Sequence, residues 1–292
     1  MREFIFTTEQ ELEIINKKNS GEKVSNIAQE YGIQKHLVYQ ILKRNGREKV
    51  IANKKYEVDE NYFENIDTEE KAYWLGFLYA DGYVRMIKYK SGADRYGELK
   101  LKLSIKDKKH LDLFKKCVGS SYTIKDAESI TINNGKHSYS VCSTLRITNI
   151  KIVKDLFKHG CINKKTYKLN FPILAENLIR HFIRGYFDGD GSISITKFKA
   201  YQNKKGKINN GYTRTVNFTS GSLSFLMDIQ NILHTKINTT NLKVGLYKKA
   251  YRIHWYSRND INNVYNYLYK DSTIFLERKK EKFIEIFNSY VK

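Results

Sequence analysis

Cysteine and proline are scarce in this sequence. Its 292 residues include three cysteines and a single proline, Pro172. Cys117, Cys142 and Cys161 are too far apart to supply the Cys-x-x-Cys pairs of a zinc site. Their odd number, in a chain of intracellular character, indicates reduced thiols. With one proline, no proline-rich linker marks a domain boundary.

The sequence also lacks the segments that membrane insertion and secretion require. It has no apolar run of about 18 residues and no basic amphipathic anchor. Its N-terminus shows no secretory signal. We therefore expect no membrane partner and an intracellular location. The cytoplasm of a bacterium or of a phage-infected host is the favoured setting, with an organelle as the alternative.

Acidic residues are too few to balance the basic ones. Lys and Arg total 52 against 31 Asp and Glu, which gives a formal net charge of +21. Hydrophobic residues make up 41% of the chain, enough for a folded core. A charge this positive predicts a polyanionic partner, and nucleic acid is the first candidate.

The first fifty residues have the spacing of three short helices. Apolar positions predict helices over about residues 8–20, 24–31 and 34–45. Ala28 falls where two helices cross closely, and Gly32 falls at a turn that requires positive φ. This spacing resembles the helix-turn-helix family, in which the second helix of the motif enters the major groove of DNA.

The third predicted helix has one apolar and one polar face. Val38 and Ile41 fall on its inner side, just as Leu12 and Ile15 share one side of the first helix. The outer side carries groups that pair with bases or phosphates. These DNA-binding candidates are Gln34, Lys35, His36, Tyr39, Gln40, Lys43 and Arg44. The alternative is a small helical bundle with a solvated basic surface.

Two segments of the chain match each other closely. Residues 72–84 read AYWLGFLYADGYV, and residues 181–193 read HFIRGYFDGDGSI. Each is an apolar helical stretch with two small residues four positions apart, followed by Asp-Gly. Small residues at this spacing let two helix backbones approach closely, so we expect the two helices to pack together. The packing candidates are Gly76, Ala80, Gly185 and Gly189.

Each repeat ends with an acid and a glycine, Asp81-Gly82 and Asp190-Gly191, 190 − 81 = 109 residues apart. We expect each glycine to adopt the left-handed conformation that ends many helices. A carboxylate at a helix C-terminus is disfavoured by the helix dipole, and two such ends repel each other. A divalent cation would relieve both effects, so Asp81 and Asp190 are candidate metal ligands. The alternative is a pair of solvated aspartates.

The DGDGSISI segment also begins like an EF-hand calcium loop. That loop needs glutamate at position 12. Counting from Tyr186 or from Asp188 places Lys197 or Lys199 there. Both registers fail, which excludes an EF-hand.

At this point the two segments resemble the signature of the LAGLIDADG homing endonucleases. WLGFLYADG and IRGYFDGDG align with that nine-residue signature without gaps, and the resemblance covers about residues 71–290. It implies two mixed α/β halves whose signature helices pack at a pseudo-twofold axis. It also implies catalytic roles for Asp81 and Asp190. Asp188 matches an earlier acid of the signature, but Tyr79 occupies that position in the first copy, so we expect no catalytic role for Asp188.

The sequence after each signature has the same order of elements. Residues 97–105, GELKLKLSI, alternate strictly, with Leu99, Leu101, Leu103 and Ile105 on one side, which predicts a half-buried strand. Periodicity predicts that each half consists of a strand pair, a helix, a second strand pair and a second helix. In the first half the helices fall at 107–118 and 150–158 and a strand at 144–148. In the second half we expect strands at 213–219 and 251–258 and helices at 222–233, 261–269 and 275–290.

These patterns and the family resemblance together imply an α/β (α+β) chain with a duplicated αββαββ fold and pseudo-twofold symmetry, preceded by a small all-α domain. The expected divisions are a helix-turn-helix domain at 1–50, a linker at 51–70 and signature halves at 71–178 and 179–292. Strands with one basic face could form a saddle over DNA; the alternative is ordinary solvated sheet surface. The candidates on this face are Lys100, Lys102, Arg146, Arg252, His254 and Arg258.

The family resemblance further implies a lysine near the scissile phosphate. Lys165, in NKKTYKL, and Lys279, in LERKKEKF, are the candidates. Lys164 and Lys280 are the alternatives, and each of these lysines could equally be solvated.

The resemblance implies a site-specific double-strand DNA endonuclease that hydrolyses one phosphodiester in each strand. Mg²⁺ or Mn²⁺ is the expected cofactor, double-stranded DNA the partner, and a monomer acting as a pseudo-dimer the active form. Its expected role is the mobility of an intron or similar element. The alternatives are an RNA-splicing maturase and a non-catalytic DNA-binding regulator, although both acids are retained. A splicing intein is disfavoured, because the chain has no terminal nucleophile and no His-Asn ending.

Overall fold

The computed structural model describes residues 6–45, 56–133, 136–162, 168–202 and 208–290. The chain divides into two units, Met1–Lys55 and Tyr56–Lys292. Residues 56–70, part of the linker predicted from the sequence, belong to the second unit. Tyr62 and Phe63 of that stretch are buried in its core.

The first unit consists of three helices, α1 (Thr8–Asn19), α2 (Val24–Glu30) and α3 (Lys35–Arg44). They pack around a small core: Ile14, Ile15, Val24, Ile27, Ala28, Val38, Ile41 and Leu42. Gly32 has a φ of 62° at the turn between α2 and α3, as its position in the sequence predicts. Leu12 does not face this core. It is 57% exposed, because Ile14 and Ile15 fill the inner side of α1 instead.

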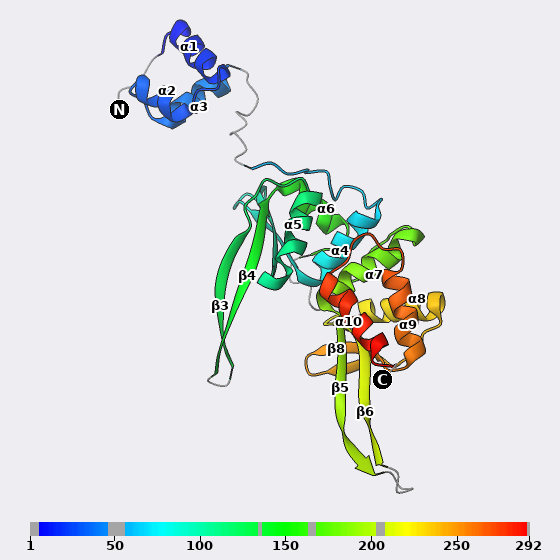
Figure 1. Cartoon of the computed structure of the whole chain (residues 1–292). Helices are drawn as coiled ribbons and strands as arrows, with labels where there is room; N and C mark the ends of the chain where they lie inside the picture. Colours follow the sequence, from blue (N-terminus) through cyan, green and yellow to red (C-terminus); the bar gives the residue numbers. More distant parts are fainter. Residues whose placement is uncertain (1–5, 46–55, 134–135, 163–167, 203–207, 291–292) are drawn as a thin grey trace. The chain divides into compact units, whose positions relative to one another are not determined.

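The second unit contains the order helix, two strands, helix, two strands, helix twice (Figure 1), and its second half ends with one further helix. The first half is α4 (Glu69–Asp81), β1 (Gly82–Lys88), β2 (Asp94–Ser104), the 3-10 turn η1 (Ile105–Asp107), α5 (Lys108–Cys117), β3 (Lys125–Asn133), β4 (Lys136–Thr148) and α6 (Ile150–Lys158). The second half is α7 (Glu176–Asp190), β5 (Ser192–Gln202), β6 (Ile208–Ser220), α8 (Leu223–Ile237), β7 (Gly245–Tyr247), β8 (Ala250–Trp255), α9 (Arg258–Tyr269) and α10 (Glu277–Asn288).

Each half forms one four-stranded antiparallel sheet. The strand orders are β1-β2-β4-β3 and β5-β6-β8-β7, so the two halves share one topology. The α+β class and the duplication that the repeats predict are therefore present. The β3–β4 and β5–β6 hairpins extend away from the paired helices α4 and α7 (Figure 1).

One face of the first sheet packs on the core and the other carries polar side chains. Leu99, Leu101 and Leu103 are buried, whereas Lys102 on the alternate side is exposed. Ile105, expected on the apolar side of this strand, is 38% exposed. The strand ends at Ser104, and Ile105 begins η1, where the alternation of sides no longer holds.

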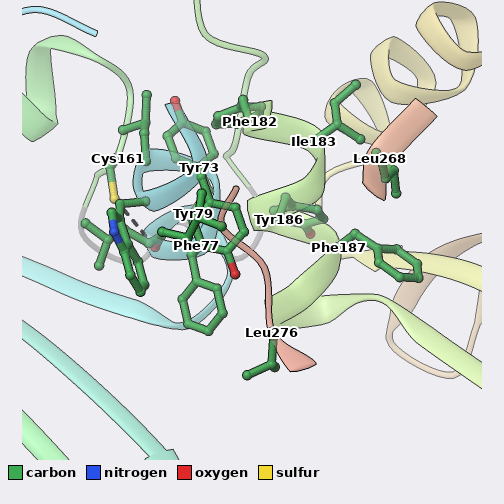
Figure 2. Close-up of a cluster of buried hydrophobic side chains, with 14 of the residues drawn as sticks. Tyr73, Phe77, Tyr79, Cys161, Phe182, Ile183, Tyr186, Phe187, Leu268 and Leu276 are labelled. Carbon is green, nitrogen blue, oxygen red and sulfur yellow. Dashed lines mark hydrogen bonds between the residues drawn. The ribbon is translucent and has the colours of Figure 1, made fainter. Parts of the chain in front are cut away.

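The centre of the second unit is the pair of helices α4 and α7. Every residue of α4 from Ala72 to Tyr79 is buried, which indicates a helix enclosed on all sides. Aromatic side chains fill the contact: Tyr79 and Phe182 lie edge to face with ring centroids 5.0 Å apart. Figure 2 shows Tyr73, Phe77 and Tyr79 of α4 beside Phe182, Ile183 and Tyr186 of α7. None of the described helices is long and apolar enough to cross a membrane.

Candidate active site

The two signature helices touch backbone to backbone at their glycines. A Cβ built on Gly76 would collide with the carbonyl oxygen of Phe182, and one on Gly185 would collide with that of Tyr73. These contacts mirror each other, because 185 − 76 and 182 − 73 both equal 109, the offset of the repeats. The crossing point therefore lies on a pseudo-twofold axis, and only glycine fits at either position.

The ends of the same helices meet next to the acids. A Cβ built on Gly189 would collide with the Cβ of Ala80 and would lie 3.3 Å from Oδ2 of Asp81. The Asp81 carboxylate thus lies against the last turn of α7, one residue before Asp190. Both acids also act on the same neighbour: burial and the negative charges of Asp190 and Asp81 raise the pKa of Tyr186.

The glycines that follow the acids are not left-handed, contrary to the sequence prediction. Gly82 has φ −72° and ψ 141°, and Gly191 has φ −72° and ψ 157°, both extended. The chain passes directly from each helix into a strand, without a left-handed cap. Glycine is needed here for space: a Cβ on Gly82 would lie 2.6 Å from the carbonyl oxygen of Leu78, and Gly191 is equally crowded against Phe187.

Lys279 lies at this same helix end. Its side chain comes from α10, is only 6% exposed, and donates a hydrogen bond to the carbonyl oxygen of Gly191. Burial, together with the charge of Arg278, lowers the pKa of Lys279 to about 8, against the opposing influence of Asp188, Asp81 and Asp190. Lys279 is therefore within electrostatic reach of both helix-end acids.

The other lysine candidates are placed differently. The ammonium group of Lys280 lies 4.0 Å from the ring centroid of Phe275, a cation–π contact. Lys164 and Lys165 fall outside the described residues. The structure thus brings Lys279 to the acids and leaves the lysine expected from the first half as a prediction.

Asp188 is a fully buried acid inside the helix pair. It accepts hydrogen bonds from the hydroxyls of Tyr73 (2.7 Å) and Tyr269 (2.5 Å) and from the backbone N–H of Leu276 (2.7 Å). Burial raises the pKa of Asp188 to about 6, although these three donors oppose the shift. The donors come from α4, from α9 and from the segment before α10. Asp188 therefore ties both halves to α7 rather than facing the helix ends.

The segment that carries Lys279 is fixed from both halves. Arg278 places its Nε 2.9 Å from both carboxylate oxygens of Asp107, which lies in η1 of the first half. Leu276 is held by Asp188 of the second half. Asp107 and Arg278 give no repeat or motif signal in the sequence, so their role became visible only from the fold.

Among the residues that the structure describes, the pair of helix-end acids does not make a complete metal site from protein groups alone. Within the described part of the chain, no three or more His, Cys, Asp and Glu side chains form a cluster that could hold a metal ion. What the geometry offers is two carboxylates at the adjoining ends of mirror-related helices, both within electrostatic reach of a buried lysine.

Residues 177–269 match the model of the LAGLIDADG-like domain. The match runs from the start of α7 to the end of α9 and so covers most of the second half. No curated protein matches the chain by sequence.

Among solved structures, the chain is similar to several LAGLIDADG proteins. The meganuclease I-AabMI bound to uncleaved DNA has 15% identity and a TM-score of 0.47, over 74% of this chain and 89% of the other. The homing endonuclease I-SmaMI bound to cleaved DNA has 15% identity and a TM-score of 0.47, over 74% and 87%. The homing endonuclease I-LtrWI bound to target DNA has 16% identity and a TM-score of 0.45, over 78% and 90%.

In the second half of the second unit, the DNA-binding candidates do not share one strand face. Arg252 and His254 lie on β8, where the guanidinium of Arg252 packs 4.2 Å from the ring centroid of Tyr247. Arg258, expected on the same strand face, is instead the first residue of α9, with its guanidinium over the ring of Tyr290. Strand β8 ends at Trp255, so alternation cannot be extended to Arg258.

In the first half, the candidates Lys100, Lys102 and Arg146 do lie on the polar face of one sheet. Lys100 and Arg146 are cross-strand neighbours on β2 and β4. Nζ of Lys100 lies 4.7 Å from the ring centroid of Tyr83 on β1. Arg146 forms an ion pair with Glu98, a residue that sequence reasoning missed. In the sequence, the only indication of Glu98 is that it is a single acid at the start of the alternation of Leu and Lys.

In the N-terminal unit, the candidates lie at or along α3. Gln34 is the N-cap of α3, and the other residues lie on the helix; the exposed set is Gln34, Lys35, His36, Tyr39, Gln40, Lys43 and Arg44. Arg44 also forms an ion pair with Glu11 of α1, with 2.9 Å between Nη2 and Oε1.

Proposed function

We propose that this chain is a LAGLIDADG homing endonuclease that cuts both strands of a specific double-stranded DNA site. The observation that carries the proposal is the placement of Asp81 and Asp190 at the adjoining ends of two mirror-related helices, within electrostatic reach of buried Lys279. Two carboxylates at helix C-termini are unfavourable in a purely structural role, because the helix dipoles and the two charges repel. Two carboxylates at adjoining helix ends instead suit a function that needs concentrated negative charge, such as binding a metal ion.

A divalent cation fits these residues. In sites that act on phosphates, Mg²⁺ is held by one or two carboxylates, with substrate phosphates and water as further ligands. Asp81 and Asp190 would hold Mg²⁺ or Mn²⁺. When bound, the cation supplies Lewis-acid stabilisation and an activated water for phosphodiester hydrolysis.

The chain's own groups provide the rest of the chemistry. At neutral pH a lysine with a pKa of about 8 is largely protonated. The ammonium of Lys279, fixed against Gly191, would stabilise the additional negative charge on the phosphoryl group in the transition state. The polar sheet faces would bind the DNA, and the two helix ends would serve one cut in each strand. By family resemblance, the product would carry short 3′ overhangs.

The N-terminal unit would act as a helix-turn-helix domain that adds affinity. Its α3 presents Lys35 and Lys43 to solvent, and the N-cap Gln34 is exposed as well, as a recognition helix requires. A linked second DNA-binding module raises overall affinity through effective concentration. We further propose that the enzyme acts as a monomer inside a bacterial or phage-infected cell, where it promotes the mobility of an intron or similar element.

The proposal is tested with a plasmid library that carries random or genomic inserts. The purified chain is incubated with the library in Mg²⁺, and the ends of linearised plasmids are sequenced. We expect a single preferred sequence cut on both strands, and binding without cutting in Ca²⁺, whose looser coordination positions water poorly. Sequence-specific binding with no cleavage in Mg²⁺ or Mn²⁺ would instead identify a DNA-binding regulator.

A further inference from the structure

A buried acid on the first sheet holds two arginines from neighbouring strands. Glu98 of β2 has a side chain that is only 3% exposed, although it lies on the polar face of the sheet. Its Oε2 accepts from Nε of Arg85 on β1 (2.5 Å), and its Oε1 lies 2.8 Å from Nε of Arg146 on β4. The carboxylate thus fixes one arginine on each side of its strand.

The cluster of Glu98, Arg85 and Arg146 contributes little to the stability of the fold. An ion pair whose arginine is 62% exposed, as Arg146 is, adds little to folding in water. Burying the Glu98 carboxylate carries a desolvation penalty that its partners must first offset. It is also a weak phosphate site, because the acid cancels one of the two positive charges.

The geometry suits recognition of a base instead. A guanidinium has five N–H donors, and here Nε is the atom that faces Glu98 in both arginines. That leaves the two terminal amino groups of each arginine to pair with the acceptors O6 and N7 of guanine. A side chain already held in place loses less conformational freedom on binding.

The second sheet has different residues at the matching positions. β1 and β5 follow the two helix-end acids at the same offset of 109, so Tyr83 and Arg85 correspond to Ser192 and Ser194. Cross-strand pairing then relates Glu98 to Thr215. Ser194 and Thr215 share a hydrogen bond of 2.6 Å where Arg85 and Glu98 form their ion pair.

The correspondence extends to the neighbouring strand. Lys100 pairs with Arg146 in the first sheet, and Asn217 pairs with His254 in the second. Asn217 is buried, and its side-chain oxygen has no hydrogen-bond partner among the described residues. One sheet thus carries fixed cationic donors where the other carries hydroxyl, amide and imidazole groups.

We infer that Glu98 is a positioning residue that orients Arg85 and Arg146 to read guanines in one half of an asymmetric DNA site. The inference rests on the proposed function. Arg85 lies four residues after Asp81, or about 13 Å along β1 at about 3.3 Å per residue. The guanines therefore lie in the part of that half-site next to the cut, and the corresponding bases of the other half-site lack this requirement.

The test is selection of bound sequences from randomised double-stranded DNA by the full chain in Ca²⁺. Wild type should select guanines in the part of one half-site that lies next to the centre of the whole site, and not in the other half-site. Arg146→Lys keeps the charge but removes the forked donors, and should reduce the preference for guanine over adenine at one position by about tenfold. Arg85→Lys should do the same at a second position. Glu98→Gln should weaken both preferences, which a purely structural role would leave unchanged.

Ser194→Ala is the matched control, because it removes the equivalent interaction of the second sheet. It should leave both guanine preferences intact. The inference is overturned if the arginine variants lose affinity equally for all sequences, which would mark phosphate binding. It is also overturned if the enzyme selects and cuts a site without central guanines, a result that spares the proposed function. A wild-type chain that prefers no DNA sequence would overturn both.

Discussion

Replacement of Gly185 by alanine probes the crossing of the two signature helices. The added methyl carbon would lie 2.8 Å from the carbonyl carbon of Tyr73 and 2.9 Å from the N of Phe77, and closer still to the oxygen of Tyr73. Ordinary contacts of a Cβ begin at 3.4 Å. All three atoms belong to the backbone of α4, so no side-chain rotation can relieve the overlap.

To clear the carbonyl carbon alone, the helices must separate by 3.4 − 2.8 = 0.6 Å along a closely packed interface, and the closer oxygen of Tyr73 demands a larger shift. Overpacking of a core by one methyl group costs about 1–3 kcal/mol, and rigid backbone on the opposing side places this site near 3 kcal/mol. For a unit of this size, each kcal/mol corresponds to about 2–4 °C in Tm. We expect Gly185→Ala to lower the Tm of the second unit by about 6–12 °C.

The measurement is thermal unfolding followed by circular dichroism. Gly76→Ala should cause a decrease of similar size, because it meets the mirror-related backbone of Phe182 and Tyr186. Gly245→Ala is the control: a Cβ there has nothing within 4 Å, so its Tm should not fall. A Gly185→Ala protein that melts within about 2 °C of wild type, less than 1 kcal/mol, would show that the helices do not cross at this residue.

Three further predictions concern acid stability, the buried lysine and the N-terminal unit. Burial lowers the pKa of His110 from 6.5 to about 4, so the folded protein disfavours protonation of this side chain. His110 therefore costs no folding stability above pH 6.5, and stability is lost as the pH falls from 6.5 toward 4. In urea titrations, His110→Gln should remove up to about 3 kcal/mol of that pH dependence; an unchanged profile would contradict the shift. Lys279→Met should lower the cleavage rate by about 10²–10³-fold with DNA binding retained, whereas Lys280→Met should cut normally; equal effects would reject the assignment of Lys279. Deletion of residues 1–55 should reduce the slope of log affinity against log salt by about 0.9 for each phosphate that this unit binds, and an unchanged slope would mean that the unit does not touch the DNA backbone.

Local patterns in the sequence predicted the elements that depend on local spacing. The three N-terminal helices, the two signature helices and the alternation of Leu99, Leu101 and Leu103 all follow from periodicity, and the structure contains them. The repeat at an offset of 109 also predicted the duplication. These features depend on short stretches of sequence, in which the spacing of hydrophobic residues alone shows which side of a helix or strand is buried.

Features that depend on tertiary register could not be predicted in this way. Gly82 and Gly191 are extended rather than left-handed, because each helix leads straight into a strand. Arg258 lies on a helix because β8 stops at Trp255. The cluster around Glu98 needs three strands in one register, and two of its members lie 48 residues apart, at 98 and 146.

The candidate site was predictable in part for the same reason. Asp81 and Asp190 stand out because the same acid occurs in both repeats. Asp188 has Tyr79 at the matching position of the first repeat, so repetition did not reveal its network with Tyr73 and Tyr269. The choice of Lys279 over Lys280 required the fold, because adjacent residues of one helix point about 100° apart.

The most direct test of the central claim compares Asp81→Asn and Asp190→Asn with wild type on the selected DNA duplex in Mg²⁺. Each substitution keeps the shape of the side chain and removes its charge. We expect both single variants to bind the duplex as wild type does and to lose cleavage of both strands. Wild-type cleavage by either variant would contradict the claim that these two helix ends form the catalytic site, and so would loss of DNA binding together with activity.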